Sequence, residues 1–253
     1  MFAPQMAVTA NRIAKNLDRI RQEISDAAAR AGRSPDGVEI VAVTKSVDVA
    51  TIKNCLKTGL TNLGESRAPQ LAERFVQVDE YLHQRHDPLQ TEVRWHMVGH
   101  LQRNKVKQVL TGADVIHSVD SLRLAEEIST RAESDERVVD IMLQVNCTQE
   151  TQKSGCAVGA ATHLGEMICS MRSVRLTGLM TMGPTSGDAE HTRRAFIRLR
   201  EVFEEMKHEK IGGDGFRHLS MGMSGDYAIA VEEGATIVRI GTALFGPDSP
   251  AVN

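Results

Sequence analysis

The chain has 253 residues, of which 41% are hydrophobic and 25% charged, a composition typical of a folded globular protein. Its 30 basic and 33 acidic residues leave a net charge of −3, which excludes a general electrostatic attraction to nucleic acid or to an anionic membrane. No apolar run approaches the roughly 18 residues that span a bilayer, and the N-terminus lacks the basic and apolar regions of a secretory signal.

The first predicted element is a long amphipathic helix over about residues 8–31, which Gly32 closes. Eight short apolar runs follow, and a helical or polar stretch comes after each. These expected strands cover residues 38–44, 60–64, 94–99, 114–119, 140–146, 175–182, 217–222 and 235–241. Strands that alternate with helices imply a parallel sheet covered by helices. We therefore predict an α/β fold, a single (β/α)₈ TIM barrel over residues 1–253 with an extra N-terminal helix; an open doubly wound sheet is the alternative.

Lys45 follows the first expected strand, at the end where barrels carry their functional residues. Side chains alternate along a strand, so Lys45 shares a face with Val41 and Val43 and should point into the barrel. Removal of the ammonium from water lowers the pKa of a lysine, and the neutral amine can form a Schiff base with an aldehyde or ketone. The simpler interpretation is a loop lysine whose ammonium reaches solvent.

The last two strands predict a phosphate site. The segment HLSMGMSGDY should end a strand near Met221 and begin a helix capped by Ser224, and a helix N-terminus binds anions. The final strand ends in Gly241, which allows close backbone approach, and Thr242, which adds a hydroxyl. Barrels often bind phosphate after strands seven and eight, and closure places strand eight beside strand one. The ligand should then carry a phosphate and a carbonyl, as pyridoxal 5′-phosphate (PLP) and sugar phosphates do.

Arg239, on the last strand, favours PLP over a sugar phosphate. PLP enzymes place an Asp or an Arg at the pyridine nitrogen. A guanidinium cannot accept a proton, so it would keep that nitrogen unprotonated and weaken the ring as an electron sink. The competing interpretation is a buried ion pair between Arg239 and a carboxylate such as Glu65.

No metal site is predicted, because the cysteines lack C-x-x-C spacing and the nine histidines form no H-E-x-x-H pattern. Free buried thiols in a reducing cytoplasm are the expected state of the cysteines. They are Cys55, Cys147, Cys156 and Cys169.

Eight short segments resemble motifs of the pyridoxal phosphate homeostasis protein family, also known as proline synthetase co-transcribed proteins: AVTK, TNLGES, WHMVGHLQRNK, IHSVDS, QKSGC, GLMTMG, LSMGMSGDY and VRIGTALFG. The resemblance covers about residues 8–246, and the pair LSMGMS and VRIGT is its most specific part. It implies a barrel like the N-terminal domain of alanine racemase, without the second domain of that enzyme.

The resemblance also implies a cofactor site with an internal aldimine at Lys45. The other implied contacts are phosphate contacts at Ser220, Ser224, Gly241 and Thr242, a pyridine-nitrogen contact at Arg239, and Asn62 in the pocket wall. Family members are described as cytoplasmic holders of PLP without established catalysis. We therefore expect a cytoplasmic, monomeric PLP-binding protein of vitamin B6 homeostasis, with PLP-dependent apoenzymes as candidate partners and no nucleic-acid or membrane binding.

The chain departs from the family pattern NFGENYVQE, where it reads NLGESRAPQLAE, so Ser66 and Arg67 alter one wall of the expected pocket. Lys153 matches a further family lysine; we expect a solvated loop residue there, with a secondary cofactor site as the alternative. His96 and His100 are expected to pack inside the protein or behind the site.

Two enzyme functions remain as alternatives, a PLP-dependent amino-acid racemase and a Schiff-base aldolase acting on a sugar phosphate. A racemase needs a base on each face of the substrate carbanion. Lys45 could serve one face, and Tyr227 is the one candidate for the other, since Tyr81 should lie on an outer helix. A non-catalytic holder of PLP is the preferred interpretation.

Overall fold

A computed structural model describes residues 7–84, 92–148, 150–185 and 188–246. Its strands are β1 (Glu39–Val43), β2 (Asn62–Glu65), β3 (Arg94–Met97), β4 (Val115–Val119), β5 (Val139–Asn146), β6 (Cys156–Ala157), β7 (Val174–Met180), β8 (His218–Met223) and β9 (Ile237–Ile240). Its α-helices are α1 (Ala10–Arg30), α2 (Val49–Leu56), α3 (Ala68–His83), α4 (Val106–Val109), α5 (Leu122–Ser134), α6 (Ala161–Cys169), α7 (Ala189–His208), α8 (Tyr227–Glu232) and α9 (Thr242–Phe245).

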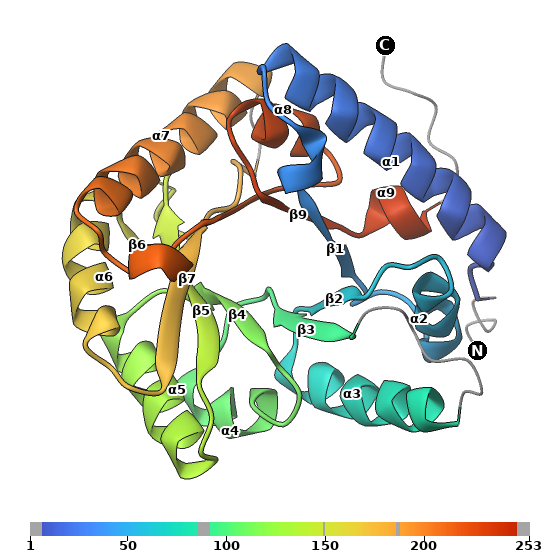
Figure 1. Ribbon diagram of the computed structural model, residues 1–253, viewed down its shortest axis with the longest axis horizontal. Coiled ribbons are helices and arrows are strands. Elements are labelled where there is room, and N and C mark those ends of the chain that lie inside the picture. The colour runs from blue at the N-terminus through green and yellow to red at the C-terminus, as the bar shows by residue number, and fades with distance from the viewer. Residues whose placement is uncertain (1–6, 85–91, 149, 186–187, 247–253) are drawn as a thin grey trace.

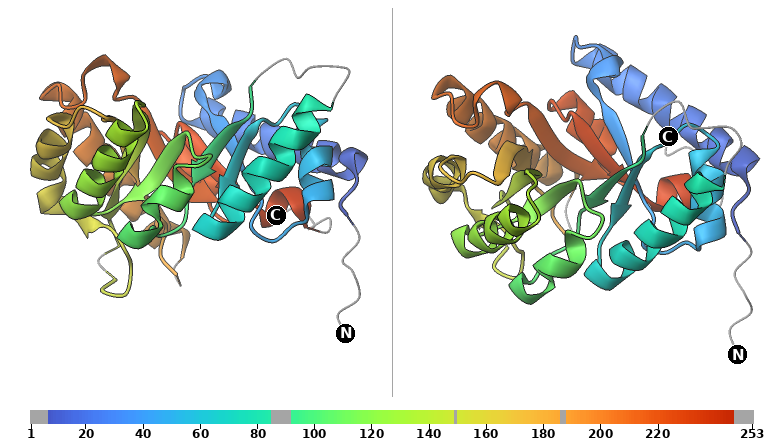
Figure 2. Two further views of the ribbon diagram at one scale, coloured as in Figure 1. Left: turned by 90° about the horizontal axis from the view of Figure 1, so that it is seen from below. Right: turned by 60° about the horizontal axis from the view of Figure 1, so that its bottom comes forward.

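The strands close into a parallel barrel. They follow the order β4-β3-β2-β1-β9-β8-β7-β5, and β4 also pairs with β5, which closes the ring. Within the described residues eight strands form this ring, so the predicted (β/α)₈ TIM barrel is confirmed and the open sheet is wrong. The helices lie outside the strands (Figures 1 and 2). The short β6, which pairs only with β5, was not predicted because two residues carry no periodic signal.

The long N-terminal helix α1 begins after Thr9, whose side chain accepts a hydrogen bond from the backbone N–H of Arg12. The prediction of a helix over about residues 8–31 is therefore confirmed to within two residues. Its apolar stripe is buried, and its polar side chains reach the last part of the chain: Asn16 donates to the carbonyl oxygen of Leu244 over 2.8 Å. The first and last helices of the barrel thus lie side by side, as Figure 1 shows for α1 and α9.

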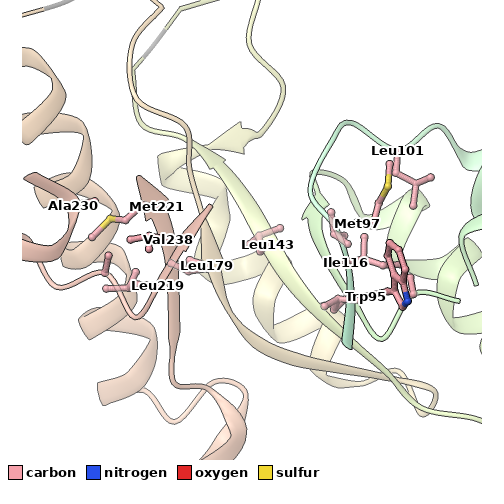
Figure 3. Packing of buried hydrophobic residues seen from close by; sticks show 14 of the residues in the cluster. Trp95, Met97, Leu101, Ile116, Leu143, Leu179, Leu219, Met221, Ala230 and Val238 are labelled. Carbon is pink, nitrogen blue, oxygen red and sulfur yellow. The ribbon is translucent and has the colours of Figure 1, made fainter. Parts of the chain in front are cut away.

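Two apolar layers build the core, because strand side chains alternate between the two faces of the sheet. The outward layer packs under the helices; Figure 3 shows Met221 and Val238 facing Ala230 of α8. The inward layer is a smaller cluster that fills the barrel: Val41, Val115, Met142, Met180 and Ile237. In the described residues, no helix is both long enough and apolar enough to pass through a bilayer.

Candidate functional site

The carboxyl ends of β8, β9 and β1 meet at one sector of the barrel rim. β9 pairs with β1, with Arg239 opposite Val41, and it pairs with β8 on its other side. A Cβ atom placed on Gly241 would lie 3.3 Å from the carbonyl oxygen of Val43. The loop after β9 therefore runs against the end of β1, as the strand order predicted.

Lys45 lies in the turn that follows β1, and its side chain is exposed. The expectation that its ammonium is removed from water is wrong, because β1 ends at Val43 and the alternation of side chains stops there. The backbone of the turn is held from α3. Arg74 donates to the carbonyl oxygens of Thr44 (2.6 Å) and Val47 (2.5 Å), and Gln70 donates to that of Lys45 (3.4 Å).

Arg74 also forms a buried ion pair with Glu65 at the end of β2. Both side chains are enclosed, with 0% of Glu65 and 7% of Arg74 exposed, and the Thr44 hydroxyl donates to the same carboxylate. We call Glu65, Gln70 and Arg74 the lysine clamp, because they fix the turn that carries Lys45. The alternative pairing of Glu65 with Arg239 is wrong, since Glu65 is occupied by Arg74.

Ser224 joins the loops after β8 and β9. Its Oγ accepts hydrogen bonds from the backbone N–H groups of Gly241 (3.2 Å) and Ala243 (3.1 Å). The expected helix cap at Ser224 is wrong, because α8 begins at Tyr227 and Asp226 occupies its N-cap position. Because Ser224 Oγ accepts from both N–H groups, the Ser224 hydroxyl keeps its own hydrogen to donate, close to the exposed hydroxyl of Thr242. Hydroxyl donors of this kind suit phosphate oxygens.

Arg239 is 4% exposed and points its guanidinium into the barrel. Its Nη1 donates to Ser220 Oγ (2.6 Å) and its Nη2 to the carbonyl oxygen of Thr181 (2.8 Å). Burial lowers the pKa of Arg239 to about 10, and the nearby Asp226 carboxylate acts in the opposite direction. Within the described ranges Arg239 forms no ion pair, so a buried cation remains without a direct anionic partner.

Ser220 lies inside the barrel and is fully buried. Its Oγ is 2.8 Å from Nδ1 of His117 as well as 2.6 Å from Arg239, so its hydroxyl is engaged below the guanidinium. This position gives no support to the phosphate contact that the resemblance implies for Ser220.

Asn62 is the first residue of β2, so it lies toward the amino end of the barrel and not at the expected carboxyl end. Its Oδ1 is 3.3 Å from Nε2 of His96, and His96 Nδ1 is 2.9 Å from His117 Nε2. These contacts complete a line of side chains across the barrel, which we call the polar row: Asn62, His96, His117, Ser220 and Arg239.

His117 is the residue that sequence reasoning missed, although its place at the middle of the apolar run 114–119 was a usable signal. Burial lowers the pKa of His96 to about 3 and the pKa of His117 well below its usual value. Arg94 and His218 add a small repulsion at His96, and the neighbouring ring and Arg239 do so at His117. Both imidazoles are therefore neutral near pH 7. His96 is buried as expected.

Two other rim residues differ from their predictions. Lys153 is not solvated: its side chain is 12% exposed and its Nζ lies 2.5 Å from both Glu150 Oε2 and the carbonyl oxygen of Gly183. The loop after β7 covers this lysine, which the sequence could not show. His100 is exposed, with Nδ1 3.3 Å from Ser154 Oγ, so the expectation of a packed ring is wrong for His100.

The tyrosines face away from the rim. The Tyr227 hydroxyl donates to Glu23 of α1, and burial together with that carboxylate raises the pKa of Tyr227. Tyr81 lies on the outer helix α3, where Lys53 Nζ is 4.8 Å from its ring centroid. Tyr227 is therefore not placed to act as a second base.

The four cysteines are free, as predicted. Cys55, Cys147 and Cys156 are buried, whereas Cys169 is exposed, which corrects its expected burial. No group of three or more metal-ligating side chains occurs among the residues that the structure describes.

Comparison with known proteins gives one consistent result. The family model "Alanine racemase, N-terminal domain" matches residues 15–249. The pyridoxal phosphate homeostasis protein of Aquifex aeolicus (strain VF5) is 36% identical over 232 residues, which are 92% of this chain and 96% of that protein. The homeostasis protein of Pseudomonas aeruginosa PAO1 is 34% identical over 234 residues, covering 92% and 95% of the two chains.

Solved structures agree with this result. A crystal structure of an unknown protein from Bifidobacterium adolescentis superimposes with a TM-score of 0.87 at 35% identity, covering 93% of this chain and 95% of the other. PipY of Synechococcus elongatus PCC7942, solved with PLP bound, has a TM-score of 0.78 at 29% identity and covers 92% of this chain and 100% of its own. Alanine racemase of Clostridium difficile 630, at 14% identity and a TM-score of 0.70, shares the fold alone. Together with the barrel and its rim, these matches show that the chain belongs to the pyridoxal phosphate homeostasis protein family.

Proposed function

We propose that this protein binds PLP at the rim formed by β1, β8 and β9 and holds it on Lys45, as a non-catalytic component of vitamin B6 homeostasis. The observation that carries the proposal is the arrangement of three groups on adjacent strands. Lys45 follows β1, Arg239 lies on the paired strand β9, and Ser224 gathers backbone donors between β8 and β9. The PLP-bound PipY, a relative in fold and sequence, supports the choice of ligand.

The residues present fit the cofactor. A buried guanidinium without an ion pair suits a neutral acceptor such as the pyridine nitrogen, because Arg239 can only donate. The Ser224 hydroxyl can donate to a phosphate, which would replace Ser224 Oγ as the acceptor for the N–H groups of Gly241 and Ala243, and Thr242 adds an exposed hydroxyl. Bound PLP supplies an aldehyde that condenses with a lysine amine, with loss of water.

Each side chain then has a role in holding the ligand. Lys45 provides the amine, and the lysine clamp fixes the backbone on both sides of it. Ser224, Gly241 and Thr242 bind the phosphate, and Arg239 keeps the pyridine nitrogen unprotonated. Asn62 and Ser220 act through the polar row and do not touch the ligand directly in this proposal.

A role without catalysis has a specific observation in its favour. The Tyr227 hydroxyl is bonded to Glu23 of α1, so it does not serve the face of the ligand opposite Lys45. Arg239 would also weaken carbanion stabilisation by leaving the pyridine nitrogen uncharged. We therefore prefer a cytoplasmic monomer that exchanges PLP with PLP-dependent apoenzymes over an amino-acid racemase.

The proposal is tested by adding PLP to the purified protein and recording its visible absorbance. We expect a yellow protein that borohydride bleaches, and a pyridoxyl adduct that peptide mass spectrometry locates at Lys45. Lys45→Ala should take up no covalent PLP, whereas Lys107→Ala, which removes an exposed lysine from α4, should behave like the wild type. An adduct on another lysine would contradict the assignment. Racemisation of L-alanine by the yellow protein at about 1 per second or faster would establish an enzyme instead.

A further inference from the structure

The polar row crosses the interior of the barrel from β9 to β2. Its four successive distances are 2.6 Å from Arg239 Nη1 to Ser220 Oγ, 2.8 Å from Ser220 Oγ to His117 Nδ1, 2.9 Å from His117 Nε2 to His96 Nδ1, and 3.3 Å from His96 Nε2 to Asn62 Oδ1. The three central side chains are almost completely enclosed, with exposed fractions of 0%, 0% and 1% for Ser220, His117 and His96. Polar groups enclosed in this way are costly unless each hydrogen bond is made.

Arg239 sets the direction of all four hydrogen bonds. A guanidinium has no acceptor, so Ser220 Oγ must accept from Nη1. The Ser220 hydroxyl can then donate to Nδ1 of His117, which leaves the His117 hydrogen on Nε2. That hydrogen points to Nδ1 of His96, and the His96 hydrogen on Nε2 points to Asn62 Oδ1.

The opposite direction leaves a group unsatisfied. If His117 Nδ1 carried the hydrogen, Ser220 Oγ would accept from both His117 and Arg239. The buried Ser220 hydroxyl hydrogen would then have no acceptor among the residues that the structure describes. An imidazolium at either ring would also bring a second positive charge toward Arg239. The row therefore has one arrangement in which every group is satisfied and both rings are neutral.

We propose that His117 and His96 are positioning residues for Arg239: through Ser220 they fix the acceptor that holds the guanidinium, and so fix its placement toward the ligand. This inference rests on the proposed PLP site for the identity of the ligand, but the direction of the row does not. A lone serine hydroxyl rotates freely, whereas a hydroxyl committed to His117 presents its lone pairs to Arg239. Successive hydrogen bonds of the same direction also polarise one another and strengthen the bond to the guanidinium.

The first test uses the protein without added PLP. The ¹⁵N chemical shifts of the histidine rings at pH 7 distinguish a protonated from a bare ring nitrogen, and spectra of His96→Gln and His117→Gln assign the signals. We expect both rings to be neutral with the hydrogen on Nε2. A hydrogen on Nδ1 of either ring, or an imidazolium, overturns the proposed row.

The second test uses the PLP-loaded protein. His117→Leu removes both ring nitrogens and should release PLP roughly tenfold faster, the loss expected for a weakened hydrogen bond to a charged group, and should shift the visible absorption band. His117→Gln should restore both properties, because a glutamine offers an acceptor oxygen and a donor nitrogen. Ser118→Ala, at the neighbouring buried position of β4, is the control and should load and release PLP like the wild type.

The possible results distinguish a failure of the positioning role of the histidines from a failure of the proposed PLP binding. If His117→Leu keeps the wild-type release rate and band, the histidines do not position Arg239. If this variant does not fold, as thermal unfolding would show, His96→Leu takes its place with an effect in the same direction, because it removes the acceptor of the His117 hydrogen and leaves Ser220 in place. A wild-type protein that takes up no PLP refutes the proposed function, and the NMR test then decides the direction of the row by itself.

Discussion

At the end of β1, Lys45 is exposed and its turn is held by a buried pair of opposite charges, whereas on β9 Arg239 is buried and held by uncharged groups. In the lysine clamp, the charge of Arg74 is neutralised by Glu65. Along the polar row, Arg239 is met by the Ser220 hydroxyl and the Thr181 carbonyl, and both imidazoles behind Ser220 are neutral. At one part of the rim a buried arginine is neutralised by a carboxylate, and at the other a buried arginine is hydrogen-bonded only to uncharged groups.

This difference distinguishes residues that support the backbone of the rim from a residue that recognises the ligand. The clamp holds backbone, and its two charges neutralise each other without a ligand. Arg239 keeps its remaining hydrogen-bonding capacity for an acceptor that arrives from outside, and a nearby carboxylate in direct contact would compete for it. We therefore expect changes in the clamp to alter stability most, and changes along the polar row to alter ligand binding and its dependence on pH.

The largest expected effect is that of Arg74→Met, which leaves the fully buried Glu65 carboxylate without its partner. Removal of one member of a buried ion pair costs about 3–5 kcal/mol. We expect the free energy of unfolding, measured by urea denaturation, to fall by that amount. Arg123→Met, at an exposed position of α5, should change it by less than about 0.5 kcal/mol.

The same measurement on Arg239→Met sharpens the contrast. This change leaves a hydroxyl and a carbonyl without a donor but no uncompensated charge, so its cost should be clearly smaller than that of Arg74→Met. Equal losses for the two variants would show that the clamp and the row do not differ in the way that we infer.

The next effect is a loss of stability in acid that comes from the polar row. Folding lowers the pKa of His96 from about 6.5 to about 3, and that of His117 is lowered as well. The unfolded chain therefore binds more protons, and stability falls as the pH drops from about 6.5 toward 3. His96 alone contributes about 2 kcal/mol between pH 7 and pH 5, at about 1.4 kcal/mol per proton and pH unit, and His117 acts in the same direction.

Urea denaturation at several pH values checks this effect, with the double variant His96→Gln, His117→Gln as the control. The control should lose the part of the slope that comes from two protons and keep the part that comes from carboxylates. An unchanged slope would mean that the two rings are protonated in the folded protein.

The sequence predicted the barrel because every buried strand leaves a short apolar run and a helix follows it. It also predicted that Lys45 and the loop around Gly241 are neighbours, because barrel closure alone places β9 beside β1. In both cases one general rule about parallel strands was sufficient.

The supporting contacts could not be predicted in the same way. His117 and Ser220 are 103 residues apart, and they meet because closure of the barrel places the inward side chains of β4 and β8 opposite each other. The Glu65–Arg74 pair depends on the rotation of α3 against β2, which determines which of several polar helix residues faces the strand end. Ser224 was identified, but as a helix cap, because the sequence does not show that two N–H groups from the next loop reach it.

A smaller effect should follow from Ser224→Ala. Hydrogen bonds to charged groups are worth roughly 1.5–3 kcal/mol, so PLP should dissociate from this variant with a Kd raised about 10- to 150-fold. Equilibrium titration of PLP measures the change, and Thr242→Val should act in the same direction. Pyridoxal, which lacks the phosphate, is the matched ligand: its affinity should be low for the wild type and unchanged by Ser224→Ala. An equal loss for both ligands would place the phosphate elsewhere.

The smallest expected effect on stability belongs to the residue with the largest role in binding. Lys45 is exposed, and the clamp holds its turn through the backbone carbonyl oxygens of Thr44, Lys45 and Val47. A substitution of the Lys45 side chain leaves all three oxygens in place. Lys45→Ala should therefore change the free energy of unfolding by less than about 0.5 kcal/mol, while it abolishes the visible band of the PLP-loaded protein. Urea denaturation without PLP measures the first quantity, and absorbance after loading measures the second. A loss of stability comparable to that of Arg74→Met would mean that the Lys45 side chain itself supports the rim. The distinction between residues that support the backbone and residues that bind the ligand would then be wrong for Lys45.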